Sequence, residues 1–84
     1  MSTIEKLKQE LKRRPNTFEW RNAKRILEHE GFFEDTSGKT SGSRVRFKDK
    51  EGISFVTHKP HPDSKLKAYA IRALAYFLEQ EGKL

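Results

Sequence analysis

Hydrophobic and polar residues alternate in the middle of the chain, between residues 43 and 48. Successive side chains of a strand point to opposite faces, so this alternation predicts a strand with one face in a core and the other in solvent. The inward set would be Ser43, Val45 and Phe47, and the outward set Arg44, Arg46 and Lys48. A loop rich in Gly, Ser and Thr, residues 37–42, precedes the strand. The strand therefore presents three cations in a row beside this loop.

The spacing of apolar residues elsewhere predicts three helices and two further strands. The expected helices span residues 2–14, 17–30 and about 66–81, and the expected strands span residues 32–36, 43–49 and 53–58. Pro15 would end the first helix, because the residue before a proline is disfavoured in the helical conformation. Gly31 and Gly82 would end the other two, because glycine readily adopts the left-handed conformation that closes helices. Short turns between consecutive strands favour antiparallel pairing.

The helices differ in how much apolar surface they offer. Trp20 lies on the apolar stripe of the second helix, which Asn16 or Thr17 can cap. The final helix, with Ser64 as a possible cap, has a wider stripe made of Ile71, Leu74, Ala75 and Leu78, extended by Tyr69 and Phe77. The first helix has a thin stripe of Ile4, Leu7 and Leu11, and it is expected to lean on the main body.

These elements predict an α+β fold. Its centre is a three-stranded antiparallel sheet with two helices packed on one face, in the order α–β–β–β–α, and an extra helix lies at the N-terminus. The helices at residues 17–30 and about 66–81 would lie side by side on that face. The far face of the sheet would carry Arg44, Arg46, Lys48, Val56 and His58.

The positive charge of the chain is concentrated in its middle third. The 84 residues carry a net charge of +6. Residues 38–67 contain eight Lys or Arg against Asp49, Glu51 and Asp63, which gives +5 for this segment alone. A solvated surface without a charged partner would mix the two signs more evenly, so the distribution favours nucleic acid or an acidic protein as the partner.

Several classes of chemistry are disfavoured by composition. The chain has no cysteine, so it can form neither a disulfide nor a thiolate site, and three histidines with carboxylates make a poor zinc ligand set. We therefore expect no metal and no cofactor. No apolar run approaches the roughly 20 residues that span a bilayer, and the first residues lack the apolar core of a signal peptide. A cytoplasmic protein without membrane contact is the expectation.

An ordered set of short segments resembles the HicA family of toxin–antitoxin proteins. The matching segments are Gly31-Phe32, Gly42-Ser43 followed by Phe47, His58-Lys59-Pro60-His61-Pro62, and Leu66-Lys67 before a helix with Ile71 and Leu74. The resemblance covers about residues 17–82. It implies a fold like the double-stranded-RNA-binding domain over residues 16–84, with residues 1–15 as an N-terminal helical extension. It also implies an mRNA interferase, a toxin that cleaves RNA and is held inactive by a HicB-type antitoxin.

One position departs from the family pattern, in which Gly-Ser is followed by a catalytic histidine. Here Arg44 stands at that position. Arginine stays protonated and cannot act as a base, although it can stabilise a developing phosphorane charge. Histidine is suited to proton transfer, so His58 and His61 are the candidate catalytic residues. The candidate residues for binding RNA phosphate are Lys39, Gly42, Ser43, Arg44, Arg46, Lys48, Lys59 and Lys67.

Three functions remain open at this point. The first is a metal-independent endoribonuclease toxin that acts on mRNA and is neutralised by a HicB-type antitoxin. The second is a module of the same fold that binds RNA or a partner without cutting. The third is a protein whose basic face is the complement of an acidic antitoxin. All three place the functional surface in the basic middle third of the chain.

Overall fold

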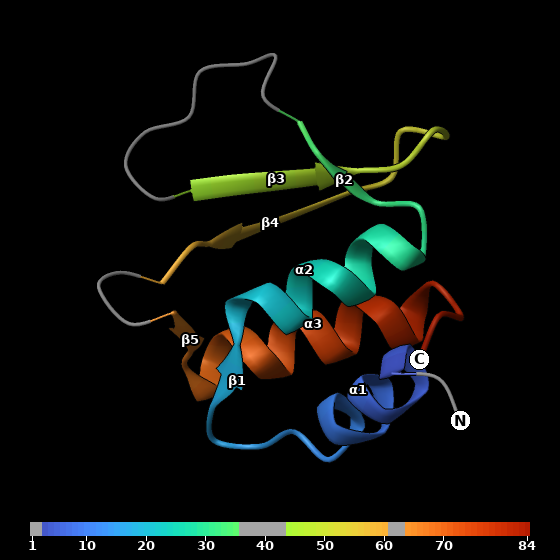
Figure 1. Cartoon of the computed structure of the whole chain (residues 1–84). Coiled ribbons are helices and arrows are strands. Elements are labelled where there is room, and N and C mark those ends of the chain that lie inside the picture. The colour runs from blue at the N-terminus through green and yellow to red at the C-terminus, as the bar shows by residue number, and fades with distance from the viewer. Residues whose placement is uncertain (1–2, 36–43, 61–63) are drawn as a thin grey trace.

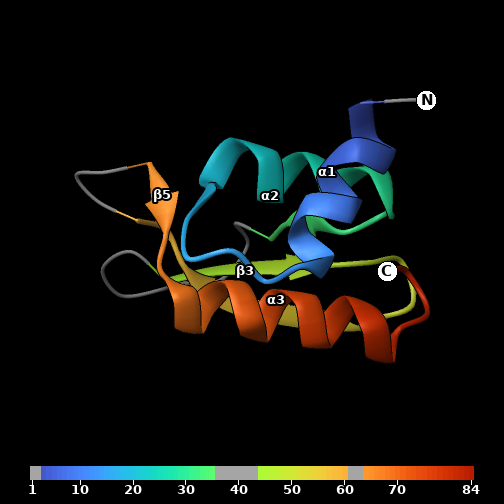
Figure 2. The same cartoon turned by 90° about the horizontal axis from the view of Figure 1, so that it is seen from below.

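The structure has three layers: a β-sheet, a pair of helices beneath it, and one further helix on the far side of that pair (Figures 1 and 2). The computed structural model describes residues 3–35, 44–60 and 64–84. The helices are α1 (Thr3–Lys12), α2 (Trp20–His29) and α3 (Ala68–Gln80). The strands are β1 (Phe18–Glu19), β2 (Phe33–Glu34), β3 (Arg44–Lys48), β4 (Ser54–His58) and β5 (Lys65–Leu66). The predicted α+β class and its extra N-terminal helix are confirmed.

The main sheet has the order β2-β3-β4, with both pairings antiparallel. The predicted alternation of the middle strand is confirmed, because Val45 and Phe47 are buried while Arg44, Arg46 and Lys48 are exposed. Helices α2 and α3 lie side by side on one face of this sheet, as both views show (Figures 1 and 2). The opposite face of the sheet carries the exposed side chains of β3 and β4.

Contacts between aromatic rings pack the sheet against the two helices. The rings of Trp20 and Phe47 lie 5.8 Å apart and join α2 to β3. The ring of Phe77 on α3 stacks on Phe55 of β4 at 4.8 Å and meets Phe32 edge-on at 5.3 Å. Such pairs add to the energy of burial and favour one relative orientation of the layers. The outward side chains of β3 and β4 therefore project from strands whose inner face is packed against the helices.

Glycines close α2 and α3 in the same way. Gly31 and Gly82 have φ values of 92° and 72°, which side chains other than glycine's rarely adopt. The amide of Phe32 donates to the carbonyl of Leu27 at 2.8 Å, and that of Lys83 donates to Leu78 at 2.8 Å. These bonds are typical of a Schellman motif and satisfy carbonyls that the helix itself leaves free. The predicted helix ends at these glycines are confirmed.

A second, two-stranded sheet changes the predicted starts of α2 and α3. Strand β1 pairs antiparallel with β5, with Phe18 opposite Leu66. Both side chains are buried, and the amide of Trp20 donates to the carbonyl of Ser64 at 2.7 Å. Because these residues are held extended, α2 begins at Trp20 rather than at residue 17. Neither α2 nor α3 has a side-chain cap, so capping by Asn16, Thr17 or Ser64 was a wrong expectation.

The apolar face of α3 is narrower than the sequence suggested. Ile71, Leu74, Ala75 and Leu78 are buried as expected, and Phe77 is half-buried. Tyr69, however, is 60% exposed. It precedes Ile71 by two residues, which is about 200° around a helix, and therefore projects from the opposite side of α3. Tyr69 thus belongs to the surface.

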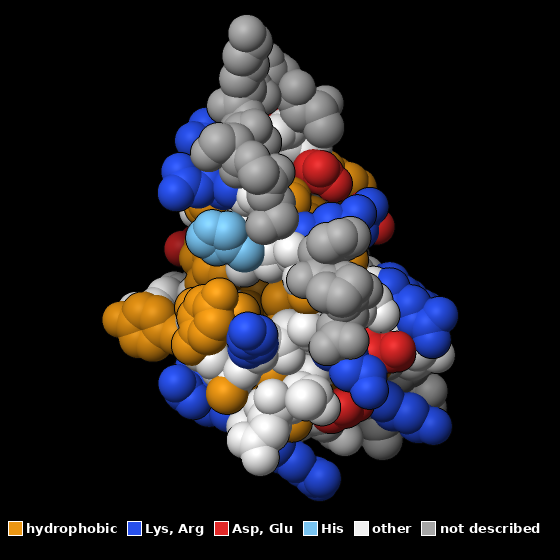
Figure 3. Space-filling model, turned by 90° about the vertical axis from the view of Figure 1, so that its left-hand side faces the viewer, with side chains coloured by type: hydrophobic (Ala, Val, Ile, Leu, Met, Phe, Trp, Pro, Cys, Tyr) orange, Lys and Arg blue, Asp and Glu red, His pale blue; other side chains and the backbone are white. Residues whose placement is uncertain are grey.

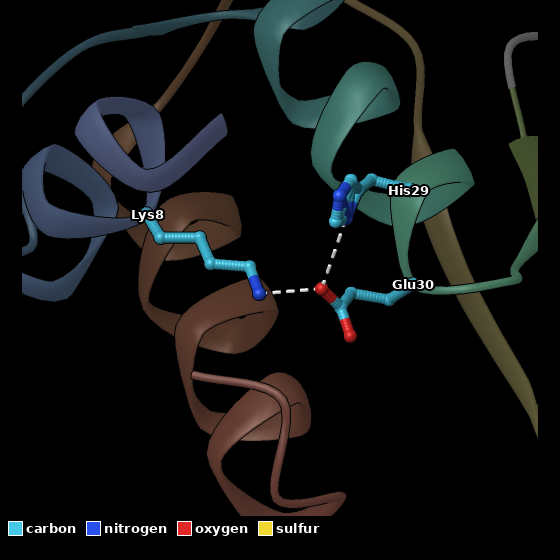
Figure 4. Close-up of polar contacts among 3 residues, drawn as sticks. All are labelled: Lys8, His29 and Glu30. Atoms are coloured by element: carbon cyan, nitrogen blue, oxygen red, sulfur yellow. Dashed lines mark hydrogen bonds and ion pairs between the residues drawn. The ribbon is translucent and has the colours of Figure 1, made fainter. Parts of the chain in front are cut away.

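Helix α1 docks on α2 and α3 through apolar and charged contacts. Leu7 and Leu11 are buried in the same core cluster as the side chains of α2 and α3. The ammonium of Lys8 is paired with the carboxylate of Glu30, which also lies 3.3 Å from Nδ1 of His29 (Figure 4). The first helix therefore packs on α2 and α3 through its thin apolar stripe, as expected. Among the helices of the described ranges, none is long and apolar enough to cross a membrane.

Candidate nucleic-acid interface

The outward face of the main sheet is built from directly opposed residues of β3 and β4. Arg44 lies opposite His58, Arg46 opposite Val56, and Lys48 opposite Ser54. Opposed residues of an antiparallel pair share a face and have Cβ atoms about 4.5–5.5 Å apart. The strand register therefore places a guanidinium beside an imidazole at one end of the face. We call Arg44, Arg46 and Lys48 the sheet-face cations.

Apolar side chains lie among these cations. Phe33 of β2 is opposite Lys48 and is 58% exposed, and Val56 is 43% exposed. Exposed apolar side chains of this size are unremarkable when isolated, but here they share one face with three cations. The face therefore offers both charge and apolar contact to a partner.

A pocket adjoins the end of this face that carries His58. It has a volume of about 460 Å³ and lies between the end of β4, the β1–β5 ribbon and the first turn of α3. Its lining includes His58, Tyr69 and three lysines, Lys59, Lys65 and Lys67. We call it the α3 pocket and these three the pocket lysines. Figure 3 looks onto this end of the molecule and shows Lys and Arg side chains around a group of hydrophobic side chains.

One carboxylate lies beside the sheet-face cations, because the register that puts Phe33 opposite Lys48 continues to Asp35 opposite Arg46. Neither the sheet-face cations nor the pocket lysines form an ion pair with a described carboxylate. Lys67 directly precedes α3, and no side chain caps the helix there. The positive end of the helix dipole therefore adds to the positive electrostatic potential at the pocket. The sheet face and the α3 pocket share His58, and their six cations outnumber Asp35, so we call the two together the electropositive surface.

The pair of Arg44 and His58 combines two chemical capacities. The guanidinium is a permanent cation whose donors match the oxygens of a phosphate. Imidazole is the side chain used most often for general acid–base catalysis, and His58 supplies one beside the guanidinium. Both side chains are exposed, so a phosphodiester can reach them without a rearrangement of the fold. No group of three His, Cys, Asp or Glu that could hold a metal ion occurs among the described residues.

The structure brings together most of the phosphate-binding residues suggested by the sequence. Arg44, Arg46 and Lys48 share the sheet face, and Lys59 and Lys67 lie with His58 around the α3 pocket. The remaining candidates lie outside the described residues; they are Lys39, Gly42, Ser43 and His61. Sequence reasoning missed Lys65 and Tyr69. Both could have been found in the sequence. Lys65 lies two residues before Lys67, and Tyr69 lies two residues before Ile71, off the apolar stripe of the final helix.

The element order and layering define an α+β protein with the layout of a double-stranded-RNA-binding domain. A family model described as the HicA toxin of bacterial toxin-antitoxin matches residues 20–82. The chain therefore belongs to the HicA toxin family of toxin–antitoxin systems, as its sequence suggested. The search of curated proteins found no significant match. The search of solved structures likewise found none. The matched range begins at the first residue of α2, so α1 and β1 precede it.

Proposed function

We propose that this protein is an RNA-binding toxin of the HicA type that cleaves mRNA in the cytoplasm and is neutralised by a HicB-type antitoxin. The observation that carries the RNA-directed part is the electropositive surface formed by the sheet-face cations and the pocket lysines. Phosphate contacts from Lys and Arg supply most of the affinity of proteins for nucleic acid. Domains of this layout recognise RNA mostly through its phosphates and 2′-hydroxyls, which paired and unpaired segments both carry.

The proposed cleavage is an attack by the 2′-hydroxyl on the adjacent phosphorus. A base takes the 2′-hydroxyl proton, the bond from phosphorus to the 5′ oxygen breaks, and an acid protonates that oxygen. The products are a 2′,3′-cyclic phosphate and a 5′-hydroxyl. We assign proton transfer to His58, with His61 as the second histidine, and charge stabilisation to Arg44. The direct opposition of Arg44 and His58 supports this assignment, since one phosphodiester can contact both.

The test is the integrity of RNA incubated with purified protein. His58→Ala should lower the cleavage rate by about 10²–10⁴-fold, the usual contribution of a positioned acid or base. Arg44→Ala should lower it through lost charge stabilisation. His29→Ala is the matched control, because His29 is an exposed histidine at the end of α2. It shares a pocket with Lys48, at the end of β3 opposite to the row of Arg44 and His58. Full cleavage by the His58 variant would remove the assignment.

Arg44 itself supports a second candidate function. It occupies the position of the family's catalytic histidine, and a domain that kept the electropositive surface without that histidine would bind RNA and leave it intact. The same experiment separates the two functions. Intact RNA with salt-dependent binding by wild-type protein identifies the binding module, whereas cleavage that depends on His58 identifies the ribonuclease.

The antitoxin part of the proposal is supported by family membership and by the mixed character of the sheet face. A protein partner uses apolar side chains in addition to charge, and Phe33 and Val56 provide them among the sheet-face cations. Phe33→Ser should weaken co-purification with a HicB-type antitoxin. Its matched control is Tyr76→Ser, which removes a similarly exposed aromatic side chain from α3. Equal retention of the antitoxin by both variants would contradict a contact at the sheet face.

A further inference from the structure

The α3 pocket has a composition that phosphate binding alone does not explain. Besides the pocket lysines its lining includes Tyr69, an aromatic residue that is 60% exposed at the start of α3. It also contains Asn16 and Thr17 from the segment between α1 and β1. A phosphate needs cations, but it gains nothing from an aromatic face. The pocket therefore fits a ligand that has an anionic part and a flat apolar part.

We infer that the α3 pocket takes one unstacked nucleotide of single-stranded RNA, with its base against Tyr69 and its phosphate among the pocket lysines. Unpaired bases are commonly stacked on aromatic side chains, which accept any base because every base has a π face. The volume of about 460 Å³ is in the range of pockets that hold small ligands. The inference rests on the proposed function, and it narrows the RNA substrate to an unpaired segment.

The position of the pocket agrees with this assignment. His58 belongs both to the α3 pocket and to the row that carries Arg44. A nucleotide held by Tyr69 would therefore place the neighbouring phosphodiester close to that row. Tyr69 is a positioning residue in this arrangement, since it binds the base and takes no part in proton transfer.

Asn16 and Thr17 add a means of discrimination between bases. Their side chains carry both donors and acceptors, which can meet the Watson–Crick edge of an unstacked base. Both residues precede the range matched by the family model. The segment that follows α1 therefore completes the pocket with groups outside the family core.

The chain provides its own matched control for Tyr69. Tyr76 lies on the same helix, is 62% exposed and is not among the residues that line the α3 pocket. The two tyrosines are seven residues apart, which is about 10 Å along one side of the helix. Tyr69→Ala and Tyr76→Ala therefore remove the same side chain from similar surroundings, inside and outside the pocket.

The experiment measures binding of a labelled single-stranded RNA of about eight nucleotides to the full chain by fluorescence anisotropy. The RNA carries 2′-O-methyl groups, so it cannot be cut by its own 2′-hydroxyls during the measurement. Tyr69→Ala should weaken binding by between about 5-fold and 150-fold, the usual range for loss of one stacked base. Tyr69→Phe and Tyr76→Ala should bind as wild type.

Salt dependence separates the base contact from the phosphate contact. Tyr69→Ala should leave the slope of log affinity against log salt unchanged, because it removes no charge. Lys67→Ala should make the slope shallower by about 0.7, the value for one phosphate of a single strand. A fully paired duplex of the same sequence should show no difference between Tyr69→Ala and wild type, because its bases are not available for stacking.

The outcomes distinguish this inference from the proposed function. If the wild-type chain binds neither single-stranded nor paired RNA, the proposed function is wrong and the nucleotide site falls with it. If the wild-type chain binds RNA and Tyr69→Ala binds it equally well, only the nucleotide site is overturned. An equal loss from Tyr69→Ala and Tyr76→Ala would also overturn it, because the effect would then not belong to the pocket.

Discussion

The helical layers and the outward face of the sheet use their charges in different ways. On the helical side, Lys8, Arg14, Arg21 and Lys24 each have a carboxylate partner, whereas Lys6, Arg13, Arg25 and Arg72 have no ion pair among the described residues. On the sheet side, the sheet-face cations and the pocket lysines have no such partner among the described residues. Neighbouring cations repel one another, and an anionic ligand relieves this repulsion. The helical side thus uses part of its charge in contacts that support the fold, whereas the charge of the sheet-face cations and the pocket lysines supports no such contact in the described part of the chain.

The largest effect should follow from breaking the helical side at its apolar contact. Leu11 of α1 is fully buried against α2 and α3. Leu11→Ala should lower the free energy of unfolding by about 2–5 kcal/mol, through lost burial and the cavity left behind. Denaturant melts would measure it. RNA affinity of the folded fraction should be unchanged, because no side chain of the sheet face or of the α3 pocket is altered.

The same variant tests the expected division of the chain at residue 15. That division, with residues 1–15 as an extension of the domain, stays a prediction. If α1 is an added part that the domain does not need, Leu11→Ala should release it without unfolding the rest. Two transitions in the melt would indicate this, whereas one cooperative transition at lower denaturant would show that α1 and the domain fold as a unit.

The next effect comes from removing charge on the sheet side. Arg46→Gln with Lys48→Gln should make the salt slope of RNA binding shallower by about 1.4, which is roughly a 25-fold loss of affinity at about 0.1 M salt. The matched control is Arg21→Gln with Lys24→Gln, which removes the same charge from α2, where these cations lie 3.4 Å and 4.0 Å from carboxylate oxygens. Equal losses from both double variants would mean that net charge, and not this surface, drives binding.

The sequence predicted only part of the difference in charge between the helical side and the sheet side. The alternation in β3 predicted the outward cations, because a period of two residues fixes which side chains share a face. The sequence could not show that Arg44 meets His58, since register depends on the turn between β3 and β4. It also gave no sign of the β1–β5 ribbon, because two residues are too few to establish a period. That ribbon brings Asn16 and Lys65 to the α3 pocket.

Local backbone conformation was also beyond the sequence pattern. Pro15 was expected to end the first helix, and α1 ends at Lys12. Arg14, however, has a φ of 51°, an unusual value for a residue other than glycine. Its guanidinium forms two bonds to the Glu79 carboxylate, at 2.6 Å and 3.2 Å. The turn thus involves a contact between residues 65 positions apart in the chain, and no local sequence pattern reveals such a contact.

A smaller effect should follow from breaking the ion pair between α1 and the end of α2. The Glu30 carboxylate is 13% exposed and lies between Lys8 and His29 (Figure 4). Lys8→Met keeps the length of the side chain and removes its charge, and should cost about 1 kcal/mol, at the upper end for pairs near a surface. Lys6→Met is the control, because Lys6 is exposed on the same helix and has no ion pair among the described residues. Equal stability of the two variants would remove this pair from the contacts that hold α1.

The smallest effect concerns the dependence of stability on pH. Hydrogen bonds from Arg14 hold the pKa of Glu79 below its ordinary value of 4.5, and the positive charges of Arg14 and Lys12 add to this. The unfolded chain therefore binds this proton more readily than the folded chain, so the contribution is complete above pH 4.5 and is lost as the pH falls through the lowered pKa. Glu79→Gln should remove this part of the acid sensitivity. The wild-type melting temperature should then fall more steeply below pH 4.5 than that of the variant.

The matched control for this measurement is Glu10→Gln. Glu10 is an exposed carboxylate of α1 without an ion pair in the described ranges, so its replacement should leave the acid slope as in wild type. RNA binding at neutral pH should be the same for both variants, because neither residue touches the sheet face or the α3 pocket. A change in RNA affinity on Glu79→Gln would break the comparison, since it would show that a pair on the helical side also controls the surface proposed for the partner.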